Sequence, residues 1–143
     1  LKDGTKKMSK SDLSDLSRIN LTDDENLIIN KIKKAKTDPL PLPSDLEELD
    51  KRPEAKNLLG IYSSLTGLTL DQSIKEFSGK NFSDFKEKLS QVLLEKIKPI
   101  SNEIKKINGE KEYLDKILSN GQKKANEFAS NKLKKMHEII GFL

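Results

Sequence analysis

Apolar residues recur at steps of three and four along most of the chain, which is the spacing of one face of an α-helix. The longest such run extends from Phe82 to Ile107. It predicts one helix over 82–108, kinked but not ended by Pro99. Shorter runs predict helices over about 25–36, 53–66, 70–78, 113–118 and 125–140. The pattern therefore predicts an all-α fold, a helical bundle.

Local signals set the expected boundaries of these helices. Residues 69–72 have the form of a capping box, and Gly109 is placed to end the long helix. Asn120-Gly121 is expected to break the chain between the last two helices. Three prolines at alternate positions remove backbone donors, so residues 37–52 are expected to form an extended connection.

The first 20 residues show little periodicity and are expected to form a loop. Within them, Lys7-Met8-Ser9-Lys10-Ser11 places two lysines around a small hydroxyl residue. Ammonium groups and short hydroxyl donors suit a mobile loop that grips phosphate oxygens. A Lys/Ser run near a chain end is also typical of a solvated tail, and the pentapeptide alone leaves both interpretations open.

Composition narrows the chemistry. The chain has no cysteine and a single histidine, which excludes disulfides, thiolate metal sites and His-rich metal clusters. We predict no metal site. The net charge of +4 favours nucleic acid or an acidic membrane as partner, and no apolar run is long enough to span a membrane.

Five segments, in order, resemble the bacterial tryptophanyl-tRNA synthetases of class I. The KMSKSD string at 7–12 resembles the family's signature loop, and four further segments are similar to family elements: residues 19–24, 31–38, 57–67 and 123–129. The resemblance covers nearly the whole chain. One departure lies at residues 39–49, which are richer in proline and leucine than the family's usual linker, so we expect a different conformation there.

The resemblance implies an enzyme that activates tryptophan with ATP and transfers it to tRNA(Trp). It implies a loop and linker from the nucleotide-binding domain over 1–20 and a helical tRNA-binding domain over 21–143. The family's HIGH-type signature has no counterpart here, so the chain is expected to be a C-terminal piece of a longer protein and inactive alone. The full-length protein is expected to be a cytoplasmic homodimer without membrane contact.

The resemblance also implies roles for the loop residues. Lys10 and Lys7 are the expected catalytic residues, because cations aimed at the departing pyrophosphate stabilise its developing charge. The expected ATP-binding residues are Lys7, Met8, Ser9, Lys10 and Ser11, and Mg²⁺ is expected to come with ATP.

Residues that read tRNA are not predicted. Lysines at 31, 33, 34, 36, 132, 134 and 135 are candidates for phosphate contacts, although lysine runs on helices are usually solvated faces. The alternative function is a stand-alone basic helical module that binds RNA or another partner.

Overall fold

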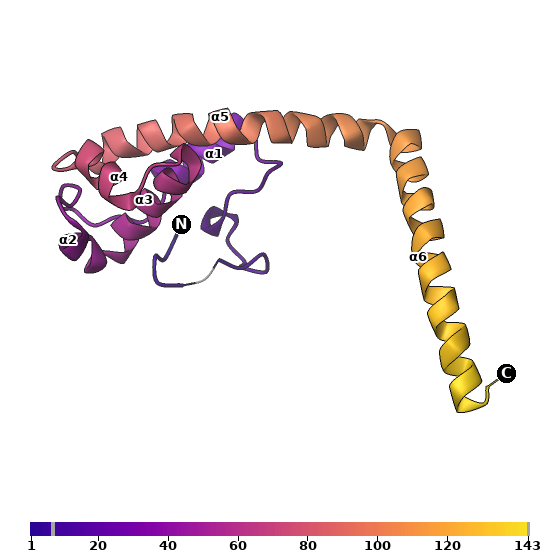
Figure 1. Cartoon of the computed structure of the whole chain (residues 1–143). Coiled ribbons are helices and arrows are strands. Elements are labelled where there is room, and N and C mark those ends of the chain that lie inside the picture. Colours follow the sequence, from indigo (N-terminus) through magenta and orange to yellow (C-terminus); the bar gives the residue numbers. More distant parts are fainter. Residues whose placement is uncertain (7, 143) are drawn as a thin grey trace. The chain divides into compact units, whose positions relative to one another are not determined.

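The computed structural model of the chain describes residues 1–6 and 8–142, and these residues contain helices and loops but no strand (Figure 1). The all-α prediction is confirmed. The elements in order are the 3-10 helix η1 (Asp15–Ser17), then α1 (Glu25–Lys33), α2 (Leu46–Asp50), α3 (Pro53–Thr66), α4 (Leu70–Phe77), α5 (Phe82–Gly109) and α6 (Lys111–Ile140).

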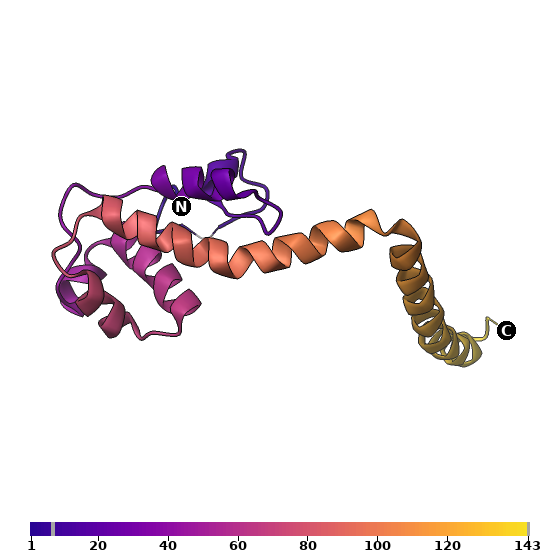
Figure 2. The same ribbon diagram turned by 90° about the horizontal axis from the view of Figure 1, so that it is seen from above.

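The chain divides into two compact units, Leu1–Asn102 and the residues from Glu103 onward. The first unit holds the hydrophobic core. In Figure 2, α1 lies on one side of the first part of α5, and α3 and α4 lie on the other. Three rings, Tyr62, Phe77 and Phe85, meet edge to face with centroids 4.8–5.9 Å apart. The core residues contributed by helices α1 to α5 include Ile28, Ile32, Leu49, Leu58, Leu59, Ile74, Phe85 and Leu89.

The helix ends follow their caps. The Asp24 side chain accepts from the Leu27 N–H at the start of α1. The capping box at Thr69 is present in both directions, and Pro53 begins α3. Gly67 ends α3 in the left-handed conformation, with φ 76°. These predicted boundaries are confirmed.

The long helix α5 is continuous through Pro99 and ends at Gly109, as predicted. Pro99 is exposed, and the buried residues of α5 all lie at or before Ser101. Proline removes one helical hydrogen bond, and the buried apolar positions before it, from Phe82 to Ile97, anchor that part of the helix to the core.

The extended connection predicted over 37–52 is wrong in its second part, where α2 forms. The Asp45 side chain caps it by accepting from the Glu48 N–H, and Leu49 is fully buried against the core. A single buried leucine and a side-chain cap are enough to hold a helix too short for periodicity to detect.

The break predicted at Asn120-Gly121 is also wrong, because α6 runs through both residues as one helix. Glycine in a helix interior costs only about 1 kcal/mol relative to alanine, which good helix formers on both sides offset. No residue of α6 is buried, and most of its large apolar side chains are exposed, Phe128 by 82%. Among the described residues, no helix is both long enough and apolar enough to cross a membrane.

Candidate functional site

The loop over residues 6–12, here called the signature loop, carries the predicted ATP-binding residues. Met8, Ser9, Lys10 and Ser11 are all exposed. The two serine hydroxyls lie 2.9 Å apart, and the Ser11 N–H donates to Ser9 Oγ at 3.3 Å. The serines thus hold a local turn and leave the Lys10 ammonium in solvent. Lys7 lies outside the described residues.

A second turn precedes the signature loop. The Thr5 hydroxyl and N–H both donate to Asp3 Oδ1, at 2.6 and 2.9 Å. These hydrogen bonds lower the pKa of the Asp3 carboxyl to about 2. Lys6 pairs with the same carboxylate at 3.5 Å. The Asp3 side chain therefore stays ionised at neutral pH and holds this turn closed.

The upstream end of the loop is packed against the bundle. The Leu1 nitrogen donates to the Ser17 carbonyl at 3.0 Å, and the Leu1 carbonyl accepts from the Lys36 N–H at 3.0 Å. Gly4 lies so close to α3 that a Cβ there would stand 2.5 Å from the Pro53 carbonyl oxygen. The close approach explains why this position has no side chain.

The downstream end is held by a polar cluster that links η1 to α1. Arg18 donates to the Asp12 carbonyl at 3.2 Å and pairs with Asp15 at 3.2 Å. Lys31 is fully buried, and its ammonium contacts Asp15 Oδ2 and Asp23 Oδ2 at 2.6 Å each. We call these residues the Lys31 cluster; it also includes Asn20, which donates to both aspartates.

The charges of the Lys31 cluster compensate each other. Burial alone would lower the pKa of Lys31, but the hydrogen bonds and charges of Asp15 and Asp23 together raise it above its usual value. The hydrogen bond from Lys31, with that from Asn20, lowers the pKa of Asp15. Lys31 is therefore a buried, paired cation and is not available to the phosphates of a nucleic acid.

The other lysines proposed for phosphate contact differ in their surroundings. Lys36 pairs with Glu54 at 2.7 Å. Lys33 and Lys34 are exposed, as are three lysines of α6, Lys132, Lys134 and Lys135. The exposed group remains available for phosphate contacts.

A cavity of about 400 Å³ lies beside the signature loop. Ile61 of α3 and Leu93 of α5 contribute apolar walls, and Met8, Lys6 and Arg18 line it from the loop side. The cavity joins an apolar surface to cationic side chains at the point where the loop meets the bundle.

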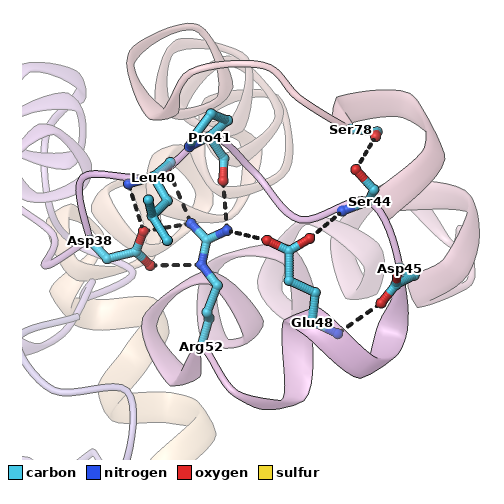
Figure 3. A network of polar contacts seen from close by, with 8 residues as sticks. All are labelled: Asp38, Leu40, Pro41, Ser44, Asp45, Glu48, Arg52 and Ser78. Atoms are coloured by element: carbon cyan, nitrogen blue, oxygen red, sulfur yellow. Dashed lines mark hydrogen bonds and ion pairs between the residues drawn. The ribbon is translucent and has the colours of Figure 1, made fainter.

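A second polar network lies away from the loop (Figure 3). Arg52, 8% exposed, donates to both carboxylate oxygens of Asp38, at 2.5 and 3.0 Å, and to Glu48 at 3.1 Å. It also donates to the Pro41 carbonyl at 2.6 Å. The network ties the proline-rich segment to the start of α3.

Sequence reasoning missed both polar networks. Lys31 lies in a lysine run that looks solvated, and Arg52 precedes Pro53 with no signal for its distant partners. Lys31 differs from Lys33, Lys34 and Lys36 in being buried, and its burial depends on which face of α1 meets the core.

Among residues 1–6 and 8–142, no three His, Cys, Asp or Glu residues gather in a way that could hold a metal ion.

Comparison with known proteins gives the family. The model of the class I tRNA synthetases (W and Y, the tryptophan and tyrosine enzymes) matches residues 1–98. The chain belongs to this family. The resemblance to tryptophanyl-tRNA synthetases is confirmed by its relatives, which are named tryptophan–tRNA ligase.

Relatives cover the chain from end to end. The tryptophan–tRNA ligase of Mesorhizobium japonicum is 50% identical over 100% of this chain and 40% of its own length. That of Rickettsia conorii is 48% identical over 100% of this chain and 43% of its own. That of Caulobacter vibrioides is 44% identical over 99% of this chain and 41% of its own length. The chain thus spans about 40% of the length of the curated relatives it matches.

Proposed function

We propose that this chain acts as part of a tryptophan–tRNA ligase, which activates tryptophan with ATP and transfers it to tRNA(Trp). The observation that carries the proposal is the identity of 44–50% over essentially the whole chain with relatives of that name. An exposed, lysine-bearing signature loop, fixed at both ends, is the structural feature that this chemistry needs.

The activation step defines the task of the loop. A carboxylate oxygen of tryptophan attacks the α-phosphorus of ATP, the bond from that phosphorus to the bridging oxygen breaks, and pyrophosphate leaves with the bonding electrons. Charge grows on the leaving oxygens, so a cation aimed at them lowers the barrier. Lys10, with Lys7, supplies this cation, and Met8, Ser9 and Ser11 complete the phosphate-binding set.

The lysine and serine side chains of the loop suit phosphate oxygens. Ammonium and hydroxyl groups donate to phosphate oxygens, whereas Mg²⁺ takes oxygen ligands such as carboxylates and waters. Mg²⁺ therefore comes bound to the ATP phosphates.

The helical region over 21–143 serves as the tRNA-binding part of the same enzyme. Support comes from the exposed lysines at 33, 34, 132, 134 and 135, whose phosphate contacts would weaken as salt rises. The full-length enzyme acts as a cytoplasmic homodimer. Loop and linker over 1–20 connect this region to the nucleotide-binding domain.

The test is amino-acid-dependent exchange of labelled pyrophosphate into ATP by the full-length protein that contains this chain. Each amino acid is supplied separately, with tyrosine as the critical competitor because the matched family includes both enzymes. We expect exchange with tryptophan only, followed by charging of tRNA(Trp). Exchange with tyrosine, or with no amino acid, would overturn the proposal.

A further inference from the structure

We propose that Lys31 is a positioning residue for the signature loop: held between Asp15 and Asp23, it fixes the segment on which the downstream end of the loop stands. The inference rests on the proposed function for its kinetic consequence. It does not place Lys31 in contact with ATP, because that side chain is fully buried.

A continuous series of contacts leads from Lys31 to the loop. The ammonium of Lys31 contacts Asp15 Oδ2 at 2.6 Å, and Asp15 Oδ1 pairs with Arg18 at 3.2 Å. Arg18 donates to the carbonyl of Asp12, the residue that ends the loop. The Asp12 N–H in turn reaches the Ser9 carbonyl at 3.4 Å, so the series ends within the turn that carries Lys10.

Asp23 anchors the other side of the cluster. Its carboxylate accepts from Lys31, from the Asn20 N–H at 2.8 Å and from the Asn20 side chain at 3.2 Å. It lies one residue before Asp24, the cap of α1, whose Ile28 and Ile32 belong to the core. The cluster thus connects the rigid interior of the first unit to the loop.

Burial of its ammonium makes the Lys31 cluster costly to separate. A buried ammonium is stable only while its acceptors stay in place, since an unpaired buried charge is strongly unfavourable. Asp15 cannot move away from Lys31 without leaving that charge half compensated. Movement of η1 is therefore restricted, and with it the base of the loop.

The contact series predicts a selective kinetic defect. If the downstream end of the loop is held less firmly, the amino-acid pocket of the full-length enzyme is unchanged, but the Lys10 side chain is less well positioned. The interaction with the phosphates of ATP weakens, whereas the affinity for tryptophan is retained.

The variant that tests this is Asp15→Asn in the full-length protein, because it removes one of the two carboxylates that face Lys31, leaves the pairing with Asp23 in place, and changes a side chain that is 49% exposed. The matched control is Asp38→Asn, which removes one of the two carboxylates that pair with another buried cation, Arg52, away from the loop. Lys31→Met and Lys31→Arg complete the set, the arginine keeping the charge and the donors.

In pyrophosphate exchange, we expect Asp15→Asn to lower kcat/KM for ATP about tenfold, the scale of a coupling of one to two kcal/mol between residues in one network. The KM for tryptophan should stay within about twofold. Lys31→Met should show the larger defect, and Lys31→Arg should recover part of it. Asp38→Asn should change neither constant.

Two outcomes would overturn the proposal: equal effects of Asp15→Asn and Asp38→Asn, or equal effects of Asp15→Asn on the constants for ATP and for tryptophan.

Amide hydrogen exchange on the same proteins separates the two proposals. Peptides covering residues 8–14 should exchange faster in Asp15→Asn than in the parent, and at the parent rate in Asp38→Asn. An unchanged rate in Asp15→Asn would overturn the positioning role even if the parent is an active ligase. If Asp15→Asn shows this faster amide exchange but the parent does not exchange pyrophosphate into ATP, the proposed function alone is overturned.

Discussion

The core of the first unit and the signature loop attached to it are held in opposite ways. Phe85 and Leu59 are fully buried and touch neighbours on several helices. Lys10 and Met8 are exposed, and the turn that carries them is closed by local hydrogen bonds, between Ser9 and Ser11 and from the Asp12 N–H to the Ser9 carbonyl. Contacts to the bundle occur at the two ends of the loop. Packing therefore fixes where the loop stands and leaves its functional side chains available to a ligand.

This difference should separate stability from chemistry. Substitutions in the core should lower the free energy of unfolding, and substitutions at the tip of the loop should change catalysis with little effect on unfolding.

The largest effect on stability is expected from Leu93→Ala, since Leu93 is 4% exposed in the core. Removing a buried leucine leaves a cavity, and we expect a loss of about 2–5 kcal/mol. Urea unfolding of the 143-residue chain followed by circular dichroism measures it. The matched control is Leu133→Ala in α6, where the leucine is 50% exposed and the change should stay within about 0.5 kcal/mol. Equal losses at the two leucines would contradict the assignment of the core.

A smaller loss is expected from Gly4→Ala, which tests the upstream end of the loop. The added Cβ would meet the backbone of Pro53 and Glu54, so the segment must shift off α3. We expect a loss of about 1–3 kcal/mol, the usual cost of overpacking. Gly60→Ala is the control, because a Cβ at Gly60 has no neighbour within 4 Å. A neutral Gly4→Ala would show that the loop is not packed there.

The smallest effect is a pH dependence centred on Asp38. Burial alone would raise the pKa of Asp38, but the hydrogen bonds from Arg52 and the Leu40 N–H outweigh it and lower the pKa below its ordinary value. Its stabilising contribution is therefore complete above that value and is lost as the pH falls through the lowered pKa. We expect Asp38→Asn to be less stable than the parent at pH 7, with the difference shrinking below about pH 4. A difference independent of pH would contradict the pairing with Arg52.

The sequence was sufficient to predict the helices that have both periodicity and caps. α3, α4 and α5 follow their apolar spacing, and their ends follow Pro53, Gly67 and Gly109. The same spacing predicts helix but not burial: α6 has it and buries nothing. Apolar periodicity indicates that a segment forms a helix. Whether that helix is buried depends on another element packing against its apolar face, and the local sequence does not show whether one does.

The exposed residues of the candidate site were proposed from the sequence, whereas the buried cluster that holds the loop was not. Lys10 and the serines belong to a contiguous motif, whereas Lys31, Asp15 and Asp23 come together only when α1 packs beside η1. The short helix α2 was missed for a similar reason, since Leu49 is buried by residues distant in the sequence.

The most direct test of the whole account is Lys10→Ala in the full-length protein that contains this chain, with unfolding and tryptophan-dependent pyrophosphate exchange measured on the same preparation. We expect unchanged stability and unchanged affinity for tryptophan. The activation rate should fall by about 30- to 1,000-fold, the equivalent of about 2–4 kcal/mol for one lost electrostatic donor. Lys75→Ala, an exposed lysine of α4 that pairs only with Asp71 among the described residues, should retain the parent rate. An exchange rate in Lys10→Ala equal to that of the parent would contradict the assignment of the signature loop.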